Sequence, residues 1–180
     1  MSEVSVAVFA GGKSSRFGSP KINAKIDGVE FGEAIFNTLK KSNFEKIFLV
    51  GGEPSDASRW GVDYLKDEFP EGGPLGALVT AMRVTRSQKL IILPCDVPFI
   101  DIQTLELLKS VNADFDVRVA RTDSPQWLCS TWRLGLKDFL ESQFGEGQRA
   151  IHQVCGLVRT EFIEVSNESL RNINLISDLD

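Results

Sequence analysis

The chain has 180 residues, of which 42% are hydrophobic and 25% charged, and its formal net charge is −5 at pH 7. This length allows one domain with a full core, while the acidic balance argues against a general nucleic-acid binder, whose ligand requires a basic face. No apolar stretch approaches the ~20 residues that span a bilayer, and residues 1–3 lack the basic start of a signal peptide. We therefore expect a cytoplasmic protein with no membrane or nucleic-acid partner.

The first half of the chain alternates short apolar runs with stretches of helical spacing. The apolar runs predict buried strands at Val4–Phe9, Ile47–Val50 and Leu90–Leu93. The helical spacing predicts helices at Phe31–Lys41, Pro74–Val84 and Ile102–Val111. Residues 60–71 between them are predicted to be irregular. This alternation favours a mostly parallel sheet covered by helices on both faces.

Beyond residue 113 the pattern is looser, but it continues to mix strands and helices. Strands are predicted at Val117–Ala120, Leu128–Trp132 and Phe162–Val165, and helices at Leu136–Phe144 and Ala150–Val154. No linker separates the two halves. The sequence therefore predicts a single α/β domain over residues 1–180.

The loop after the first strand, within AVFAGGKSSRFGSPK, concentrates glycine and positive charge. Gly11 and Gly12 let the backbone turn sharply and approach a ligand closely, and Arg16 and Lys21 add charge that suits an anion. Open α/β sheets bind ligands at the edge where this loop leaves the strand. The loop is neither a Walker A, because Ala7 stands where that motif needs glycine, nor a dinucleotide fingerprint. An exposed turn with solvated charges is the alternative reading.

A second signal is the stretch LIILPCDVPFI, in which a buried strand runs directly into Asp96. This carboxylate leaves the sheet at the same edge as the glycine loop, and Pro94 and Pro98 restrict its direction. Mg²⁺ commonly takes one or two carboxylates together with water and phosphate oxygens. Asp96 is therefore a predicted metal ligand, with a turn or helix cap as the alternative.

Two further stretches carry weaker signals. GGPLGAL, residues 72–78, opens a helix with small residues that would let a flat base lie against the backbone. NINLISDL, residues 172–179, places Asn172 and Asn174 two positions apart, on one side of a strand-like segment. Each has a simple structural alternative, a helix start in the first case and an edge strand in the second.

Together, these four stretches resemble the molybdenum cofactor guanylyltransferases. The opening motif of that family, L-A-G-G-x-S-x-R-[MF]-G-x-x-K, corresponds to residues 9–21, and G-P-L, C-D-x-P and N-x-N follow in order. The resemblance implies a three-layer, Rossmann-like nucleotidyltransferase fold with a mostly parallel, mixed central sheet. It also implies a reaction in which the terminal phosphate of molybdopterin attacks the α-phosphorus of GTP, releasing pyrophosphate and forming molybdopterin guanine dinucleotide.

The resemblance assigns the nucleotide side of the site. The residues that it implies for GTP are Phe9, Ala10, Gly11, Gly12 and Lys21, with Lys21 on the phosphates. Asp96 would hold Mg²⁺, and we infer that Arg16 neutralises charge on the leaving pyrophosphate. Arg16, Lys21 and Asp96 are thus the predicted catalytic residues.

The family also has a nucleotide-contacting aspartate ahead of G-P-L, and we choose Asp63 for it, with Asp67 as the alternative. Asn172 and Asn174 would lie near the acceptor or the metal. The chain departs from the family pattern at 175–176, where Leu-Ile replaces the usual Thr-Pro. The resemblance further implies molybdoenzymes or other proteins of cofactor biosynthesis as partners.

Two alternative functions remain open from the sequence. A cytidylyltransferase of the same fold could act on molybdopterin or on a sugar or polyol phosphate. Related CTP users resemble L-A-A-G in the opening motif, whereas Gly11 here lacks a Cβ and leaves room for the larger purine, which favours GTP. A non-catalytic GTP-binding protein would keep the glycine loop but would not need Asp96.

Overall fold

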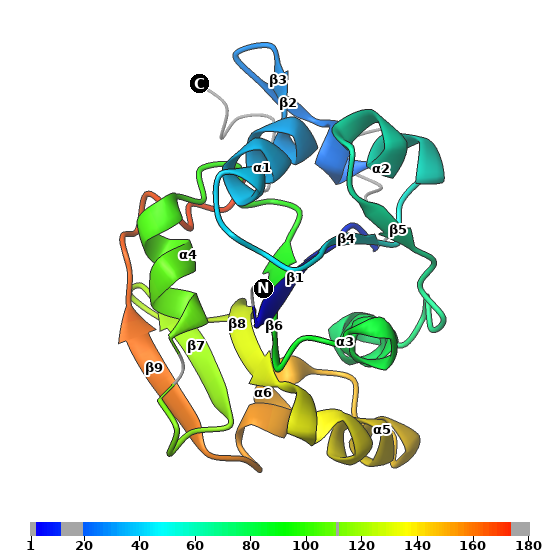
Figure 1. Cartoon of the computed structure of the whole chain (residues 1–180), viewed down its shortest axis with the longest axis vertical. Coiled ribbons are helices and arrows are strands. Elements are labelled where there is room, and N and C mark those ends of the chain that lie inside the picture. The colour runs from blue at the N-terminus through cyan, green and yellow to red at the C-terminus, as the bar shows by residue number, and fades with distance from the viewer. Residues whose placement is uncertain (1–2, 12–19, 111, 174–180) are drawn as a thin grey trace.

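The computed structural model describes residues 3–11, 20–110 and 112–173. A seven-stranded sheet lies between two layers of helices (Figure 1). Its strand order is β5-β4-β1-β6-β8-β7-β9. The strands are β1 (Val4–Phe9), β4 (Ile47–Val50), β5 (Asp63–Leu65), β6 (Lys89–Pro94), β7 (Val117–Arg121), β8 (Pro125–Arg133) and β9 (Thr160–Glu164).

Only β8 runs against the other strands of this sheet. Strands β5, β4, β1 and β6 pair in parallel, β8 is antiparallel to both β6 and β7, and β9 is parallel to β7. A short antiparallel hairpin, β2 (Lys25–Ile26) and β3 (Val29–Glu30), lies outside the sheet. The predicted three-layer fold with a mostly parallel, mixed sheet is confirmed.

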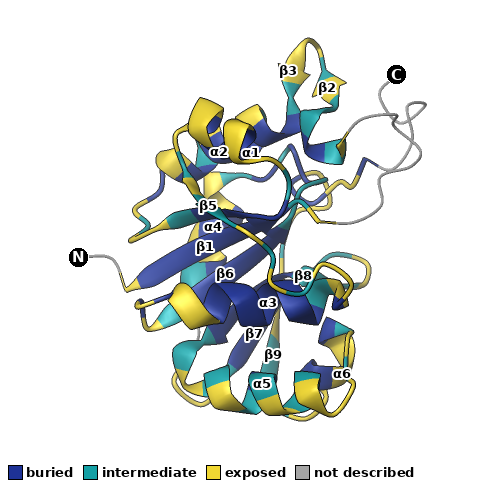
Figure 2. Ribbon diagram, turned by 90° about the vertical axis from the view of Figure 1, so that its right-hand side faces the viewer, coloured by how far each residue is buried: buried dark blue, intermediate teal, exposed yellow. Residues whose placement is uncertain are grey.

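The helices divide between the two faces of the sheet (Figure 2). One core cluster contains side chains of α1 (Phe31–Lys40), α2 (Pro54–Trp60) and α4 (Ile102–Lys109). The other contains side chains of α3 (Gly73–Val84), α5 (Lys137–Gly145) and α6 (Ile151–Cys155). The described residues also form two short 3₁₀ helices, η1 (Lys21–Asn23) and η2 (Leu134–Leu136). None of the helices in the described part of the chain is long and apolar enough to cross a bilayer.

Strand β1 shows why the sheet needs both layers. Successive side chains of a strand point to opposite faces, so Val6 and Val8 join the first core cluster while Ala7 and Phe9 join the second. All six residues of the strand are buried. A continuous apolar run is the pattern expected for a parallel strand covered on both sides.

The prediction that residues 60–71 are irregular is wrong in part. This range contains the end of α2 and the whole of β5. Helix α2 has seven residues, and its buried apolar side chains are only Ala57 and Trp60. Strand β5 has three residues, none of them buried. Both elements are therefore too short and too polar to give a periodic signal.

The predicted strand-like segment at the end of the chain is also corrected where it can be seen. Asn172 and Ile173 belong to no strand, and Asn174 lies outside the described residues. The side chain of Ile173 is nevertheless buried in the protein. Ile173 is thus held by packing and not by a sheet ladder.

The parallel strands bring their carboxyl ends to one edge of the sheet. Phe9, the last residue of β1, is in register with Val50 of β4 and Pro94 of β6, and Val50 is in register with Leu65 of β5. The loops that follow these strands must therefore emerge side by side. Ligands of open α/β sheets bind at this edge.

Candidate functional site

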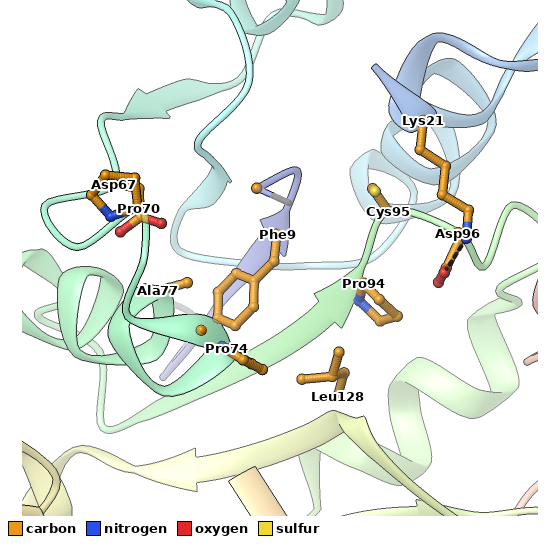
Figure 3. A pocket seen from close by; sticks show the side chains of 12 residues that line it. Phe9, Lys21, Asp67, Pro70, Pro74, Ala77, Pro94, Cys95, Asp96 and Leu128 are labelled. Carbon is orange, nitrogen blue, oxygen red and sulfur yellow. Dashed lines mark hydrogen bonds and ion pairs between the residues drawn. The ribbon is translucent and has the colours of Figure 1, made fainter. Parts of the chain in front are cut away.

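A cavity of about 290 Å³ lies at the carboxyl edge of the sheet, close to the lower end of the ~300–1,000 Å³ typical of small-molecule sites. Three strand ends supply it, because Gly11, Asp67 and Asp96 each stand two residues beyond β1, β5 and β6. In Figure 3, Asp67 lies on one side of the Phe9 ring, and Lys21 and Asp96 lie on the other. The cavity thus has charged groups on both sides of an apolar middle.

Lys21 and Asp96 meet at the cavity although 75 positions separate them in the sequence. The Nζ of Lys21 donates a hydrogen bond to Oδ2 of Asp96 over 2.6 Å. The two side chains are only 16% and 15% exposed. Ion pairs of this kind interact more strongly than surface pairs, because water screens them less.

Asp96 has a second oxygen that the described residues leave unsatisfied. Its Oδ1 is buried and has no hydrogen-bond partner among them. The carbonyl oxygen of Asp96, by contrast, accepts a hydrogen bond from the Ile173 N–H over 3.2 Å. A buried carboxylate oxygen without a donor is costly. This oxygen is therefore suited to a bound cation, since no described residue supplies a partner for it.

The donor set at Asp96 fits Mg²⁺ rather than an all-protein metal cage. Within the described residues, no group of three or more histidine, cysteine, aspartate or glutamate side chains is arranged to hold a metal ion. Mg²⁺ is usually bound through one or two carboxylates, with water and substrate phosphates supplying its remaining ligands. One carboxylate with a free buried oxygen, beside a cavity, meets that requirement.

Asp67 is held with one oxygen bonded to the protein and the other facing the cavity. Its Oδ1 accepts hydrogen bonds from the Phe69 N–H at 2.9 Å and the Thr80 hydroxyl at 3.4 Å. Its Oδ2 faces Gly11, since a Cβ added to Gly11 would lie 3.6 Å from that oxygen. The glycine therefore leaves open the space above a fixed carboxylate.

The structure places Asp67, and not Asp63, at the cavity. Asp63 is the first residue of β5 and lies at the amino edge of the sheet, where its half-exposed side chain pairs with Lys46 at 2.9 Å. Asp67 lies beyond the carboxyl end of the same strand and lines the cavity. Because β5 is short and has no buried residue, the sequence pattern does not show which of the two aspartates lies at its carboxyl end.

The start of α3, within GGPLGAL, forms one wall of the cavity. Gly73 has a positive φ of 63°, and a Cβ there would lie 3.1 Å from the carbonyl oxygen of Arg149. That same oxygen accepts the N–H of Leu75 over 3.1 Å. Pro74 and Ala77 then present small apolar surfaces to the cavity.

The remaining predicted residues divide into three groups. Phe9, Gly11, Lys21 and Asp96 line the cavity. Ala10 does not, because its backbone N–H bonds to the Val50 carbonyl and its side chain lies against Gly52. Asn172 is exposed beside Ile173, outside the lining. The other three, Gly12, Arg16 and Asn174, lie outside the described residues.

Sequence reasoning missed several lining residues, including Cys95, Pro70 and Leu128. Burial, followed by the charge of Asp96, raises the pKa of the Cys95 thiol to about 12. The thiol is therefore protonated at neutral pH and acts as a small apolar wall, not as a nucleophile. Its position directly before Asp96 was the only signal available in the sequence.

Comparison with known proteins shows the family of the chain. A model of the MobA-like NTP transferase domain matches residues 6–159. A probable molybdenum cofactor guanylyltransferase of Clostridium perfringens is 25% identical over 100% of this chain and 94% of its own length. Its counterpart in Aquifex aeolicus is 28% identical over 96% of this chain and 86% of its own length.

A solved structure shows the same fold. The molybdopterin-guanine dinucleotide biosynthesis protein A of Archaeoglobus fulgidus superposes with a TM-score of 0.80 at 22% identity. The superposition covers 97% of this chain and 94% of that one. The likeness therefore extends over both halves of the sheet and includes the edge at which the cavity lies.

Proposed function

Because the chain belongs to the MobA-like NTP transferase family, we propose that it transfers GMP from GTP to molybdenum cofactor. The products are molybdopterin guanine dinucleotide and pyrophosphate. The observation that carries this proposal is the meeting of Lys21 and Asp96 at one cavity, over 2.6 Å. The names of the full-length relatives supply the identity of the two substrates.

The reaction asks the protein mainly to position its substrates and to neutralise charge. The terminal phosphate of the cofactor attacks the α-phosphorus of GTP, and a new phosphorus–oxygen bond forms. The bond from the α-phosphorus to the bridging oxygen breaks, and the electron pair leaves with pyrophosphate. The attacking phosphate is already anionic at neutral pH, so no general base is needed. Lys21 would hold the phosphates of GTP, and Arg16 would neutralise charge on the pyrophosphate.

Asp96 would hold Mg²⁺ through the buried Oδ1 that lacks a partner among the described residues. When bound, the ion would supply positive charge to the phosphate oxygens during the transfer. Lys21 would remain beside the other carboxylate oxygen and keep the carboxylate oriented. The Lys21 ammonium group, after the loop that follows β1, and the Asp96 carboxylate, after β6, would thus bind the same GTP molecule.

Asp67 and Gly11 support guanine as the base. The Watson–Crick edge of guanine carries adjacent N–H donors, which a fixed carboxylate can accept, and sites built to accept donors reject bases that lack them. The absence of a Cβ at Gly11 keeps the space above Asp67 Oδ2 open for a purine. We therefore replace Asp63 with Asp67 as the nucleotide-contacting aspartate.

A backbone contact of Asp96 supports a proposal for the acceptor side. Because the Ile173 N–H bonds to the Asp96 carbonyl, the Asn-Ile-Asn segment starts beside the loop that bears the proposed metal ligand. Asn172 and Asn174 are accordingly proposed to contact the cofactor or the metal. We expect the enzyme to act in the cytoplasm and to pass its product to molybdoenzymes or to other proteins of cofactor biosynthesis.

The test is incubation of the protein with molybdenum cofactor, Mg²⁺ and one of GTP, CTP or ATP, with the dinucleotide detected by mass spectrometry. We expect product with GTP, and little with the other two nucleotides. Asp96→Ala should abolish turnover, and omission of Mg²⁺ should do the same. Product with CTP alone would replace the proposal by a cytidylyltransferase. GTP binding without product, unchanged by Asp96→Ala, would point to a non-catalytic binder.

A further inference from the structure

The segment that presents Lys21 to Asp96 is a single short turn. Lys21 begins the three-residue helix η1, and Asn23 ends it. Between them, Ile22 is 1% exposed and packs in the core cluster that also holds α1 and α2. The Lys21 carbonyl accepts the N–H of Ala24 over 3.0 Å. An element this short has few contacts of its own, so its side chains must fix its orientation.

Asn23 is tied to α2 by a polar cluster that lies outside the cavity. Its Nδ2 donates to Asp56 Oδ2 at 3.2 Å, and its Oδ1 accepts from Arg59 at 3.1 Å. Arg59 also donates to Asp56 Oδ1 at 2.8 Å and to Glu30 of the β2–β3 hairpin at 3.0 Å. These four residues, Asn23, Glu30, Asp56 and Arg59, form the Asp56 cluster. It joins η1, the hairpin and α2 in one network.

The burial of Asp56 sets this network apart from an ordinary surface ion pair. Asp56 is 6% exposed, although α2 already has Ala57 and Trp60 to pack into the core. Placing a carboxylate in such a position is costly and is not a good way to gain stability. Directional polar networks can instead fix one arrangement out of several similar ones. Here the arrangement that they fix includes the helix that carries Lys21.

We propose that Asp56 is a positioning residue that acts through Asn23 and η1 to hold Lys21 against Asp96. Asp56 is not among the described residues that line the cavity, and its described route to Lys21 passes through Asn23 and the short helix η1. The consequence for turnover rests on the proposed function, because it assumes that Lys21 binds the phosphates of GTP. The structural part, that the Asp56 cluster supports the Lys21–Asp96 ion pair, does not depend on the reaction.

The first test is a double-mutant cycle on urea unfolding, with Asp56→Asn and Lys21→Met. Asp56→Asn keeps the shape of the side chain but sets an NH₂ group where an acceptor now faces Asn23 or Arg59. If Asp56 supports the Lys21–Asp96 pair, the change that Lys21→Met makes in the unfolding equilibrium constant should shrink by about tenfold in the Asp56→Asn background. Additive effects, within about twofold, would overturn the proposal.

The second test is the same cycle read as kcat/KM for GTP. Misplacing a catalytic group by about 1 Å can cost on the order of a hundredfold in rate, so we expect Asp56→Asn to lower kcat/KM by about 10- to 100-fold. In the Lys21→Met background the further loss should be less than about threefold. An equal loss in both backgrounds would mean that Asp56 does not act through Lys21.

Two other variants separate positioning from general damage. Exchanging the partners, as Asn23→Asp with Asp56→Asn, restores one carboxylate and one amide between the same two positions and should recover most of the activity. Asp116→Asn breaks an ion pair with Arg159 at 2.7 Å, outside the cavity lining, and should change kcat/KM by less than about twofold. Failure of the exchange to recover activity would count against the proposal.

If Asp56→Asn does not fold, Asn23→Ala takes its place in both cycles. It frees η1 from the cluster but leaves the Asp56–Arg59 ion pair of α2 intact. The same coupling to Lys21→Met is expected, and additivity would again overturn the inference. A wild-type protein that makes no product would refute the proposed function, while the unfolding cycle would still decide the role of Asp56.

Discussion

Replacing Lys21 with methionine removes the ammonium group and keeps most of the side-chain volume. At 2.6 Å, the attraction between the two charges amounts to about 6 kcal/mol at an effective dielectric constant of ~20. Much of this attraction offsets the cost of taking both groups out of water. Breaking a buried pair by removing one partner typically costs ~3–5 kcal/mol. Since both side chains keep some exposure, we expect the lower end, about 3 kcal/mol in the free energy of unfolding.

The assay is urea unfolding of the wild type, Lys21→Met, Asp96→Asn and the double variant. Each single variant should cost about 3 kcal/mol, because each leaves one charge unpaired. The double variant should cost about the same as either one, which gives a coupling energy of about 3 kcal/mol. A coupling below ~0.5 kcal/mol would show that the two groups do not pair in solution, and the reasoning that places them at one site would fail.

Three further predictions concern the walls of the cavity. Asp67→Asn should raise KM for GTP by about 10- to 100-fold, which corresponds to the ~1.5–3 kcal/mol expected for a charge-assisted hydrogen bond. Asp63→Asn should leave the steady-state KM unchanged, and the reverse result would make Asp63 the nucleotide-contacting aspartate. Gly11→Ala should lower kcat/KM for GTP more than for CTP in competition assays, because its methyl would occupy space beside Asp67 Oδ2, and equal losses would refute the base argument. Cys95, with a thiol pKa of about 12, should gain reactivity only as the pH approaches that value, so iodoacetamide at pH 8 should alkylate it at least about 100-fold more slowly than a free cysteine. A labelling rate close to that of a free cysteine, measured by mass spectrometry, would contradict the raised pKa.

The parts of the fold that the sequence predicted are those with continuous apolar runs. Val4–Phe9 is buried on both faces of the sheet, and each of its residues is apolar or small. Such a continuous run predicts a strand without any knowledge of which side chains point to which face. The parallel order of such strands also predicts that the glycine loop and Asp96 emerge at one edge of the sheet. Lys21 and Asp96 were therefore expected together, and they lie 2.6 Å apart.

The features that the sequence did not predict depend on strand register and on contacts between residues far apart in the chain. Strand β5 has three residues and no buried side chain, so nothing in its pattern indicated which of Asp63 and Asp67 lies at the carboxyl edge. The role of Asp56 has no signal in the sequence either, because its partner Asn23 lies 33 positions away and only the tertiary structure brings it to α2. The Ile173 N–H likewise meets the Asp96 carbonyl without any local signal.

The central claim is that one nucleotide triphosphate lies between Lys21 and Asp96. A crystal structure with a non-hydrolysable GTP analogue and Mg²⁺ tests it most directly, through the distances from these two side chains to the phosphates. We predict the Lys21 Nζ within hydrogen-bond distance of a phosphate oxygen, the metal on Asp96 and the guanine edge at Asp67. A nucleotide bound elsewhere, or phosphates directed away from both Lys21 and Asp96, would contradict the account.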